Sequence, residues 1–145
     1  MTLRAAEPGD AAACAKVFND WVDATPWMPR VHPADDVERF YRDHLLATCD
    51  VTVAEKGGIA RGFIAVDGEG FVAGFYLAPE VRGRGVGRAL LDRAKAAGRP
   101  LTLWTFVANE GARRFYAREG FSELRRTDGD NEEGLPDVLL EWRPR

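Results

Sequence analysis

The sequence has few of the side chains that build covalent cross-links and metal sites, because only two cysteines and two histidines occur among its 145 residues. Cys14 falls in the first segment predicted to be helical and Cys49 near the end of the second. This placement indicates structural thiols in a reduced protein rather than a disulfide framework. With only His32 and His44 as imidazole donors, no zinc or other metal site is expected.

Long apolar runs are also missing. No segment approaches the roughly 20 apolar residues that span a bilayer, and the polar stretch Met1–Asp10 contains no apolar leader. We therefore expect a cytoplasmic protein without a membrane partner. Lysine is scarce beside arginine, and the net charge of -3 argues against nucleic-acid binding driven by overall charge. The length predicts one domain over residues 1–145.

Hydrophobic periodicity and turn residues predict an α/β fold. The predicted helices span residues 11–23, about 33–49, 86–97 and 109–119, and the predicted strands span 3–6, 51–55, 59–66, 71–77, 101–107, 121–127 and 138–142. Asp10 is the expected N-cap of the first helix. The strands on either side of the third helix are expected to be parallel neighbours joined by a right-handed crossover. The order of elements indicates a sheet of mixed direction with helices on both faces.

The glycine-rich segment Arg82–Arg88 lies between a predicted strand and a predicted helix. Its glycines leave backbone N–H groups unshielded, and a helix N-terminus attracts anions, so the turn is expected to hold a phosphate. The alternative is an ordinary turn with solvated arginines. The P-loop pattern fails because Gly87 is followed by Arg88-Ala89, and the dinucleotide fingerprint fails on the spacing of the glycines.

Two motifs together resemble those of the GNAT superfamily of N-acetyltransferases. Arg82-x-x-Gly85-x-Gly87-Arg88, after a strand that ends Tyr76-Leu77-Ala78-Pro79, is similar to its acyl-CoA-binding turn. The run from Asn109 through Phe115-Tyr116 to Gly120-Phe121 is similar to its second signature. The resemblance covers nearly the whole chain. It implies a mixed, mostly antiparallel central sheet of about six or seven strands with helices on both faces.

The resemblance also implies roles for individual residues, with acetyl-CoA as the co-substrate and no metal. The pyrophosphate would lie on the amides of the turn, and the pantetheine arm would pair with the preceding strand, whose amides would also polarise the thioester carbonyl. Tyr116 would be the general acid for the leaving thiolate; the alternative is a core tyrosine. Asn109 would contact the CoA arm while capping its helix. The expected cofactor-binding residues are Phe75, Leu77, Arg82, Gly83, Arg84, Gly85, Val86, Gly87, Arg88 and Asn109.

The acceptor is expected to be a small-molecule or peptide amine. Trp27 and Arg30, in the loop after the first helix, are candidates for an aromatic wall and a carboxylate-binding cation; the alternatives are packing and solvation. No general base is assigned, because the strand before the turn carries no carboxylate. Glu55, Asp67 and Glu69 could act through water, and the acidic loop with Asp128, Asp130, Glu132 and Glu133 could attract a cationic amine.

The predicted activity is therefore direct acetyl transfer from acetyl-CoA to a primary amine. The alternative is a non-catalytic acyl-CoA-binding sensory module on the same fold, since a fold does not by itself fix a function. Members of the superfamily are often dimers, so the resemblance also allows a homodimer.

Overall fold

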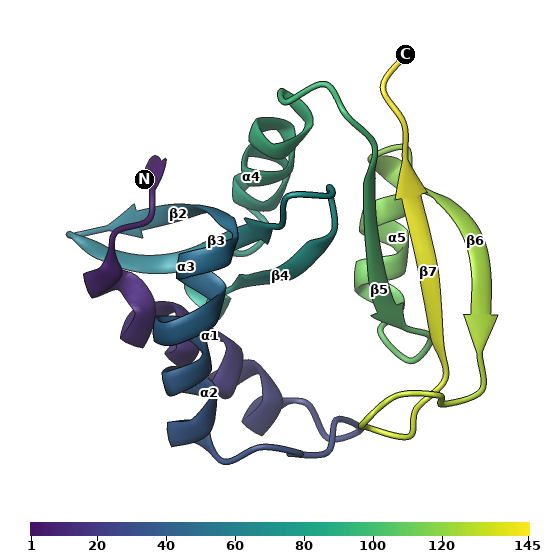
Figure 1. The fold of residues 1–145 in the computed structure, drawn as a ribbon, viewed down its shortest axis with the longest axis horizontal. Coiled ribbons are helices and arrows are strands. Elements are labelled where there is room, and N and C mark those ends of the chain that lie inside the picture. The colour runs from purple at the N-terminus through teal and green to yellow at the C-terminus, as the bar shows by residue number, and fades with distance from the viewer.

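Seven strands form two antiparallel sheets in the computed structural model, which describes residues 1–145 (Figure 1). The first sheet has the order β1 (Thr2–Ala5), β2 (Asp50–Lys56), β3 (Ile59–Val66) and β4 (Val72–Leu77), and the second has the order β5 (Leu101–Phe106), β7 (Asp137–Trp142) and β6 (Ser122–Thr127). The mixed, mostly antiparallel seven-strand architecture is confirmed. Its division into two sheets between β4 and β5 was not part of the prediction.

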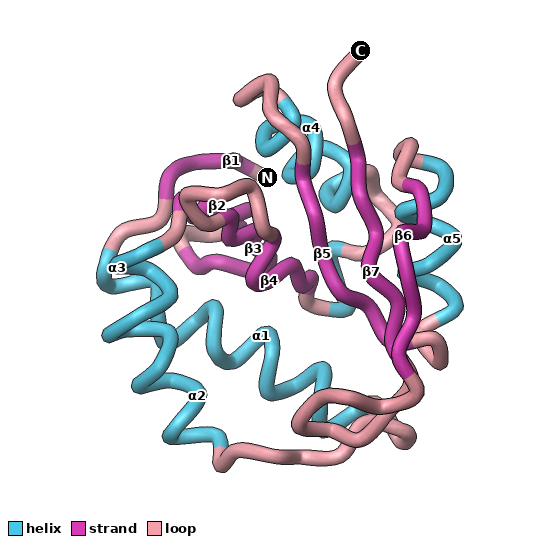
Figure 2. The backbone as a smooth tube through the Cα atoms, turned by 45° about the vertical axis from the view of Figure 1, so that its right-hand side comes forward, coloured by secondary structure: helices cyan, strands magenta, loops and turns pink.

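The helices cover both faces of the first sheet, as predicted (Figures 1 and 2). In chain order they are α1 (Ala11–Ala24), α2 (Ala34–Phe40), the π-helical turn η2 (Tyr41–Leu45), α3 (Leu46–Thr48), α4 (Val86–Lys95) and α5 (Glu110–Arg118). α1 and α2 lie on one side of the sheet and α4 on the other, while α5 packs behind the second sheet. The predicted second helix is one continuous segment whose middle turn is π-helical. No helix is long and apolar enough to cross a membrane.

Asp10 precedes α1 as expected, but its side chain does not cap that helix. Its carboxylate instead accepts from the Glu7 N–H at 2.7 Å and from both terminal nitrogens of Arg4 at 2.7 and 3.0 Å. The hydrogen bonds from Arg4 hold the pKa of Asp10 below its usual value. A short 3-10 turn, η1 (Pro8–Asp10), places the carboxylate over the preceding chain, and this geometry explains the difference.

β4 and β5 are parallel neighbours at one point only. Phe71 and Thr102 form an isolated parallel bridge, and the Thr102 N–H donates to the Gly70 carbonyl at 3.0 Å. Gly70 has a φ of +87°, and a Cβ there would lie 2.4 Å from the Pro100 carbonyl oxygen. Only glycine therefore permits this close approach. Beyond the bridge the two strands diverge, as Figure 1 shows, so the predicted parallel pairing is confirmed only at its beginning.

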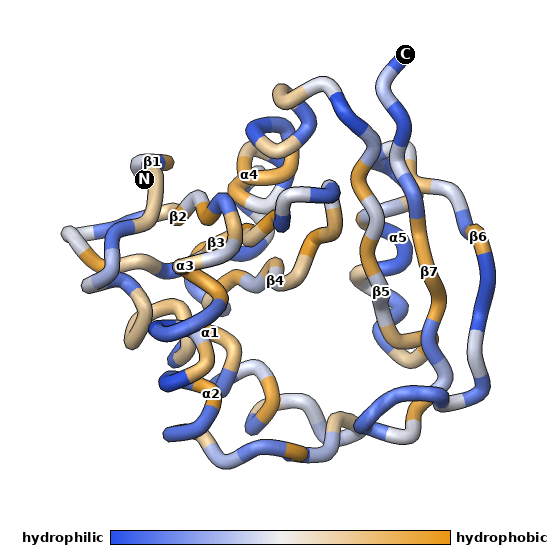
Figure 3. The backbone as a smooth tube through the Cα atoms, viewed as in Figure 1, coloured by the Kyte–Doolittle hydropathy of each residue, from blue (hydrophilic) through white to orange (hydrophobic).

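The core lies between the sheets and the helices. Its largest fully buried side chains include Phe63, Ile64, Leu90, Leu91, Leu101 and Leu103. Burial of a side chain of this size stabilises the fold by about 1.5–3 kcal/mol. In Figure 3, apolar residues follow β3, β4, β5 and β7, while β6 is a largely hydrophilic edge strand. β4 is hydrogen-bonded to β3, and β5 is hydrogen-bonded to β7. Beyond the single bridge, the edges of β4 and β5 that face each other are not paired.

Candidate functional site

The divergence of β4 and β5 opens a cavity of about 540 Å³. Four parts of the chain line it: β4, the glycine turn, β5 and α5, with Trp21 added from α1. Most of the lining side chains are apolar. The predicted site residues that line it are Phe75, Leu77, Arg82, Gly83, Gly87, Asn109 and Tyr116. The two sequence motifs therefore meet at one cavity, although they lie more than 20 residues apart in the chain.

The glycine turn presents a row of unpaired backbone donors. Gly83 and Gly85 both have positive φ values, of +72° and +78°, and α4 begins directly after them. Helical bonding starts only where the Ala89 N–H donates to the Gly85 carbonyl at 3.0 Å, so the N–H groups of Gly83 through Arg88 have no backbone partner. Such a nest at a helix N-terminus binds anions, and a pyrophosphate fits it.

The remaining turn residues from the prediction, Arg84, Gly85, Val86 and Arg88, lie outside the cavity lining. The side chain of Val86 is buried, whereas those of Arg84 and Arg88 are exposed, and Arg88 has only distant contacts of 3.8–3.9 Å with Glu119 and Asp92. Long, solvated arginines of this kind remain available to an anion at the turn.

The edge of β4 that faces the cavity also carries free backbone groups. The Ala78 N–H donates to the Arg61 carbonyl on β3 at 2.7 Å. Because hydrogen-bonding groups alternate sides along a strand, those of Leu77 and Phe75 point away from β3, toward the cavity. The Arg82 Nε donates to the outward Leu77 carbonyl at 3.0 Å, which agrees with this direction. An extended amide-bearing chain could pair with this edge as an added strand does.

Gly87 and Asn109 bring α4 and α5 to the cavity. A Cβ at Gly87 would lie 3.4 Å from Leu77 Cδ1 and 3.6 Å from the Phe115 ring, so a glycine lets the first turn of α4 pack closely on β4 and α5. The Asn109 side chain accepts from the Ala112 N–H at 3.2 Å, which confirms its capping role. Its Oδ1 is engaged in the cap, and its Nδ2 donors remain for a ligand in the cavity.

Tyr116 lies on the buried face of α5, where aromatic rings surround it. The ring centroids of Phe121, Phe115 and Phe75 lie 5.3, 5.4 and 6.3 Å from its own. Burial, with a smaller contribution from Tyr76, raises the pKa of the Tyr116 phenol well above its usual value of 10.0. The hydroxyl therefore keeps its proton at neutral pH, and it can donate that proton or a hydrogen bond to a group in the cavity.

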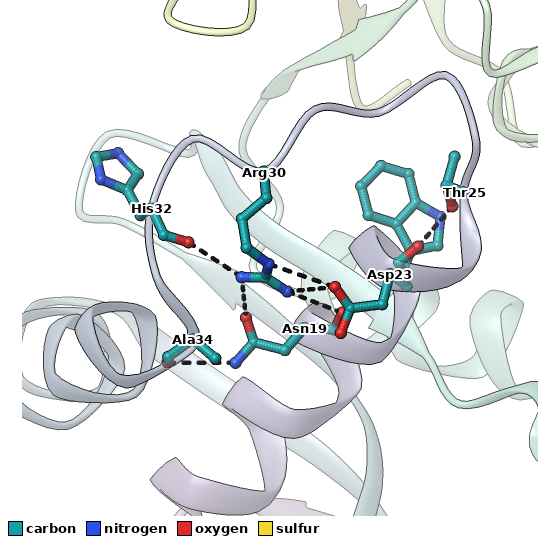
Figure 4. A network of polar contacts seen from close by, with 7 residues as sticks. Asn19, Asp23, Thr25, Arg30, His32 and Ala34 are labelled. Carbon is teal, nitrogen blue, oxygen red and sulfur yellow. Dashed lines mark hydrogen bonds and ion pairs between the residues drawn. The ribbon is translucent and has the colours of Figure 1, made fainter.

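Trp27 and Arg30 do not line the cavity. The Trp27 ring packs against Trp21 and Phe106, both at 5.8 Å, and so supports the wall from behind. The Arg30 guanidinium donates to Asp23, to Asn19 and to the His32 carbonyl, as Figure 4 shows, and so ties the 25–33 loop to α1. A substrate carboxylate would have to displace Asp23 from Arg30, so this geometry favours an anchoring role.

A second cavity, of about 260 Å³, adjoins the first. The two share Trp104, Thr105 and Phe106 of β5, and the second is completed by residues of the β6–β7 loop and the start of β7: Asp130, Asn131, Glu133 and Asp137. The acidic loop is therefore not remote from the apolar cavity. It forms the wall of the space next to it.

The three carboxylates that the sequence suggested as bases lie outside both cavities. Glu55 accepts from the Arg4 Nε at 3.1 Å. Asp67 accepts from the N–H groups of Glu69 and Phe71 in the β3–β4 turn, and Glu69 is exposed there. Each of these carboxylates therefore has a structural or solvated environment rather than a place at the site.

The sequence did not predict that β5 lines both cavities. Leu101, Leu103 and Thr105 alternate with the half-buried Thr102, Trp104 and Phe106. Apolar residues on both faces of a strand indicate burial on both faces. The sequence contains no signal that tells a packed face from one that lines a cavity.

Comparison with known proteins agrees with this geometry. The family model described as an acetyltransferase (GNAT) domain matches residues 47–123. The chain is 28% identical to peptidyl-lysine N-acetyltransferase YiaC of Escherichia coli over 84% of this chain and 85% of that one, and 30% identical to L-amino acid N-acyltransferase MnaT of Escherichia coli over 64% and 60%. Among solved structures, apo YjaB from Escherichia coli superposes with a TM-score of 0.78 at 24% identity, covering 99% of this chain and 98% of that one. YncA from Salmonella typhimurium, solved with acetyl-CoA, superposes with a TM-score of 0.75 at 23% identity, covering 99% and 93%.

Proposed function

Because the chain belongs to the GNAT family of acetyl-CoA-dependent N-acetyltransferases, we propose that it transfers the acetyl group directly to a primary amine, with Tyr116 as the general acid. One observation carries this proposal. The glycine turn borders the cavity through Gly83 and Gly87, and the free edge of β4 and the Tyr116 ring border the same cavity. The backbone N–H groups of Gly83 through Arg88 in that turn are unpaired. A donor held by the turn and the strand thus has its reactive end beside a protonated phenol.

The backbone binds the acyl donor in this proposal. The amides of Gly83 through Arg88 receive the pyrophosphate at the N-terminus of α4, and Arg82, Arg84 and Arg88 add positive charge around it. The outward groups of Phe75 and Leu77 pair with the pantetheine amides. The Asn109 Nδ2 donates to the same arm. A backbone N–H of the Phe75–Leu77 stretch polarises the thioester carbonyl, which stabilises the oxyanion that forms during attack.

Tyr116 acts on the leaving group. A neutral amine attacks the thioester carbon, the C–S bond breaks, and the phenol of Tyr116 gives its proton to the departing sulfur. A thiol of this kind has a pKa of about 8.5, so a nearby donor speeds its departure at neutral pH. The position of Tyr116 supports the role, because its side chain lines the cavity and its hydroxyl has no hydrogen-bond partner within the chain.

The acceptor remains a primary amine of a small molecule or a peptide. YiaC is named for peptidyl-lysine and MnaT for L-amino acids, so both acceptor types belong in the test. Release of free thiol from acetyl-CoA is measured with a lysine-containing peptide, a set of L-amino acids and spermidine. Thiol release that depends on one of these amines supports the proposal. Tight CoA binding without turnover on any amine favours the sensory module instead.

A further inference from the structure

We propose that Glu133, in the β6–β7 loop, is the general base that takes the proton from the acceptor ammonium. This inference rests on the proposed function and concerns the side of the site that faces the acceptor. An alkyl ammonium has a pKa of about 10.4 and must lose a proton before it can attack. None of the carboxylates in the first sheet lies at either cavity, so the base has to come from elsewhere in the fold.

The position of Glu133 matches this task. It lines the second cavity, which we call the acidic cavity. This cavity shares Trp104, Thr105 and Phe106 with the larger first cavity. Thr105, only 9% exposed, borders both spaces, and its hydroxyl makes no hydrogen bond within the chain. The hydroxyl oxygen is not fully buried, so it is accessible to water or to a polar ligand at the junction. An amine that enters through the acidic cavity therefore reaches the thioester past Glu133.

Glu133 differs from its acidic neighbours in its burial and in its lack of a bonding partner. It is half-buried, and its carboxylate forms no ion pair. Asp137 is buried, but its oxygens already accept from Thr127 and from Asn131 at 3.0 Å. Asp130 is exposed, and Glu132 is paired with His32 at 2.6 Å. Glu133 is thus the carboxylate at this cavity that is both partly shielded from water and free to accept a proton.

The cavity that Glu133 lines adjoins the one that β4 borders. Tyr76 of β4 lines the first cavity and Glu133 lines the second, and Trp104, Thr105 and Phe106 border both. The charge of Glu133 adds to burial, the larger cause, in raising the pKa of the Tyr76 phenol. The other charged or titratable groups around Glu133 are Asp130 and Asp137 beside it and the His32–Glu132 pair where the α1–α2 loop meets its own loop. Most of these are acidic, which favours a cationic amine.

The proton transfer balances without any further reactant. The Glu133 carboxylate accepts one proton from the ammonium, directly or through one water, and the neutral amine forms the new C–N bond. The C–S bond breaks, and Tyr116 protonates the sulfur. The nitrogen loses its second proton as the tetrahedral intermediate collapses, and this proton restores the Tyr116 phenol, directly or through water. Glu133 then releases its proton to solvent. The net products are the amide, the CoA thiol and one proton.

The pH profile of kcat/KM tests this role, with the best of the three amine types above as the acceptor. Without a base, the reaction depends on neutral amine from solution, whose fraction rises about 100-fold between pH 7 and pH 9 for a pKa near 10.4. We expect Glu133→Gln to lower kcat/KM by about 10²–10⁴-fold at pH 7 and to regain about 100-fold of this by pH 9. The native profile should change only a few-fold over that range. Glu133→Asp should restore part of the activity.

Matched variants keep the result specific. Asp128→Asn, which alters an exposed carboxylate in the same loop that lines neither cavity, should keep the native profile. Calorimetric binding of acetyl-CoA and the thermal unfolding midpoint should match the native values in all variants. A Glu133→Gln profile parallel to the native one, or an alkaline rise found with Asp130→Asn instead, overturns the role of Glu133 alone. If the native protein acetylates none of the amines, the proposed function and this inference both fail.

Discussion

Replacement of Tyr116 by phenylalanine removes one oxygen atom and leaves the aromatic packing in place. The ring keeps its contacts with Phe75, Phe115 and Phe121, at centroid distances of 5.3–6.3 Å. The hydroxyl has no hydrogen-bond partner within the chain, so its loss strands no other group. We therefore expect the free energy of unfolding to change by less than about 0.5 kcal/mol and the Kd for acetyl-CoA to change less than about twofold.

The effect on turnover should be much larger. General acid catalysis contributes about 10²–10⁴-fold, which corresponds to roughly 2.7–5.5 kcal/mol of activation free energy. Burial raises the pKa of Tyr116, so the native phenol stays protonated from neutral pH to above pH 10. The Tyr116-dependent part of kcat should therefore not decline until the pH passes that raised pKa. The loss in Tyr116→Phe should accordingly be the same at pH 7 and pH 9.

A thiol-release assay under single-turnover conditions measures the acetyl-transfer step directly. Tyr41→Phe is the matched control, because Tyr41 is also a buried tyrosine, at 7% exposure, but lies in η2 and lines neither cavity. It should leave the rate unchanged. A single-turnover rate for Tyr116→Phe within about threefold of the native rate would refute the general-acid assignment.

The other predictions concern the turn, the 25–33 loop and the strand junction. Gly85→Leu should raise the Kd for CoA, measured by calorimetry, at least about tenfold, because the new side chain would occupy the space through which the phosphate approaches the turn. Gly57→Leu is the control for backbone strain and should not change the Kd, because Gly57 has a similar φ of +62° and open surroundings. Arg30→Ala should lower the unfolding free energy by about 1 kcal/mol, and Asp23→Ala by less, because Arg30 also donates to Asn19 and to the His32 carbonyl. A KM increase for carboxylate-bearing acceptors with Arg30→Ala alone would instead favour a substrate clamp. Gly70→Ala should lower the unfolding free energy in urea by about 2 kcal/mol or more, from its left-handed φ and the contact with a backbone oxygen, and an unchanged midpoint would contradict the tight junction.

Much of the donor site could be predicted from sequence because its parts are local. The Gly83–Arg88 turn follows a strand and opens a helix, and the N–H groups of such a turn are unpaired wherever the helix packs. The capping role of Asn109 is equally local, since Asn109 directly precedes α5 and its side chain accepts from the Ala112 N–H three residues on. Tyr116 lies on the same helix, and its proposed role came from the resemblance to the superfamily rather than from the local pattern. The structure adds that all three border one cavity.

The acceptor side could not be predicted in the same way, because it depends on contacts between distant segments. Arg30 and Glu133 both carry charge in loops, and nothing in their sequence neighbourhoods tells one from the other. Arg30 is anchored because the 25–33 loop folds back onto α1. Glu133 reaches a cavity because the β6–β7 loop turns under β5.

The sequence by itself determined the elements, their order and the position of the glycine turn at the start of a helix, because periodicity, caps and turn residues act over a few neighbouring positions. Only the tertiary structure decided where β4 and β5 separate. That separation follows from one close approach of backbone, in which Gly70 lies against Pro100 and bonds to Thr102, while β3 and β7 hold the outer edges of the two strands. The divergence of β4 and β5 depends on several such long-range contacts together. The cavity between them therefore cannot be predicted from any single segment of the sequence.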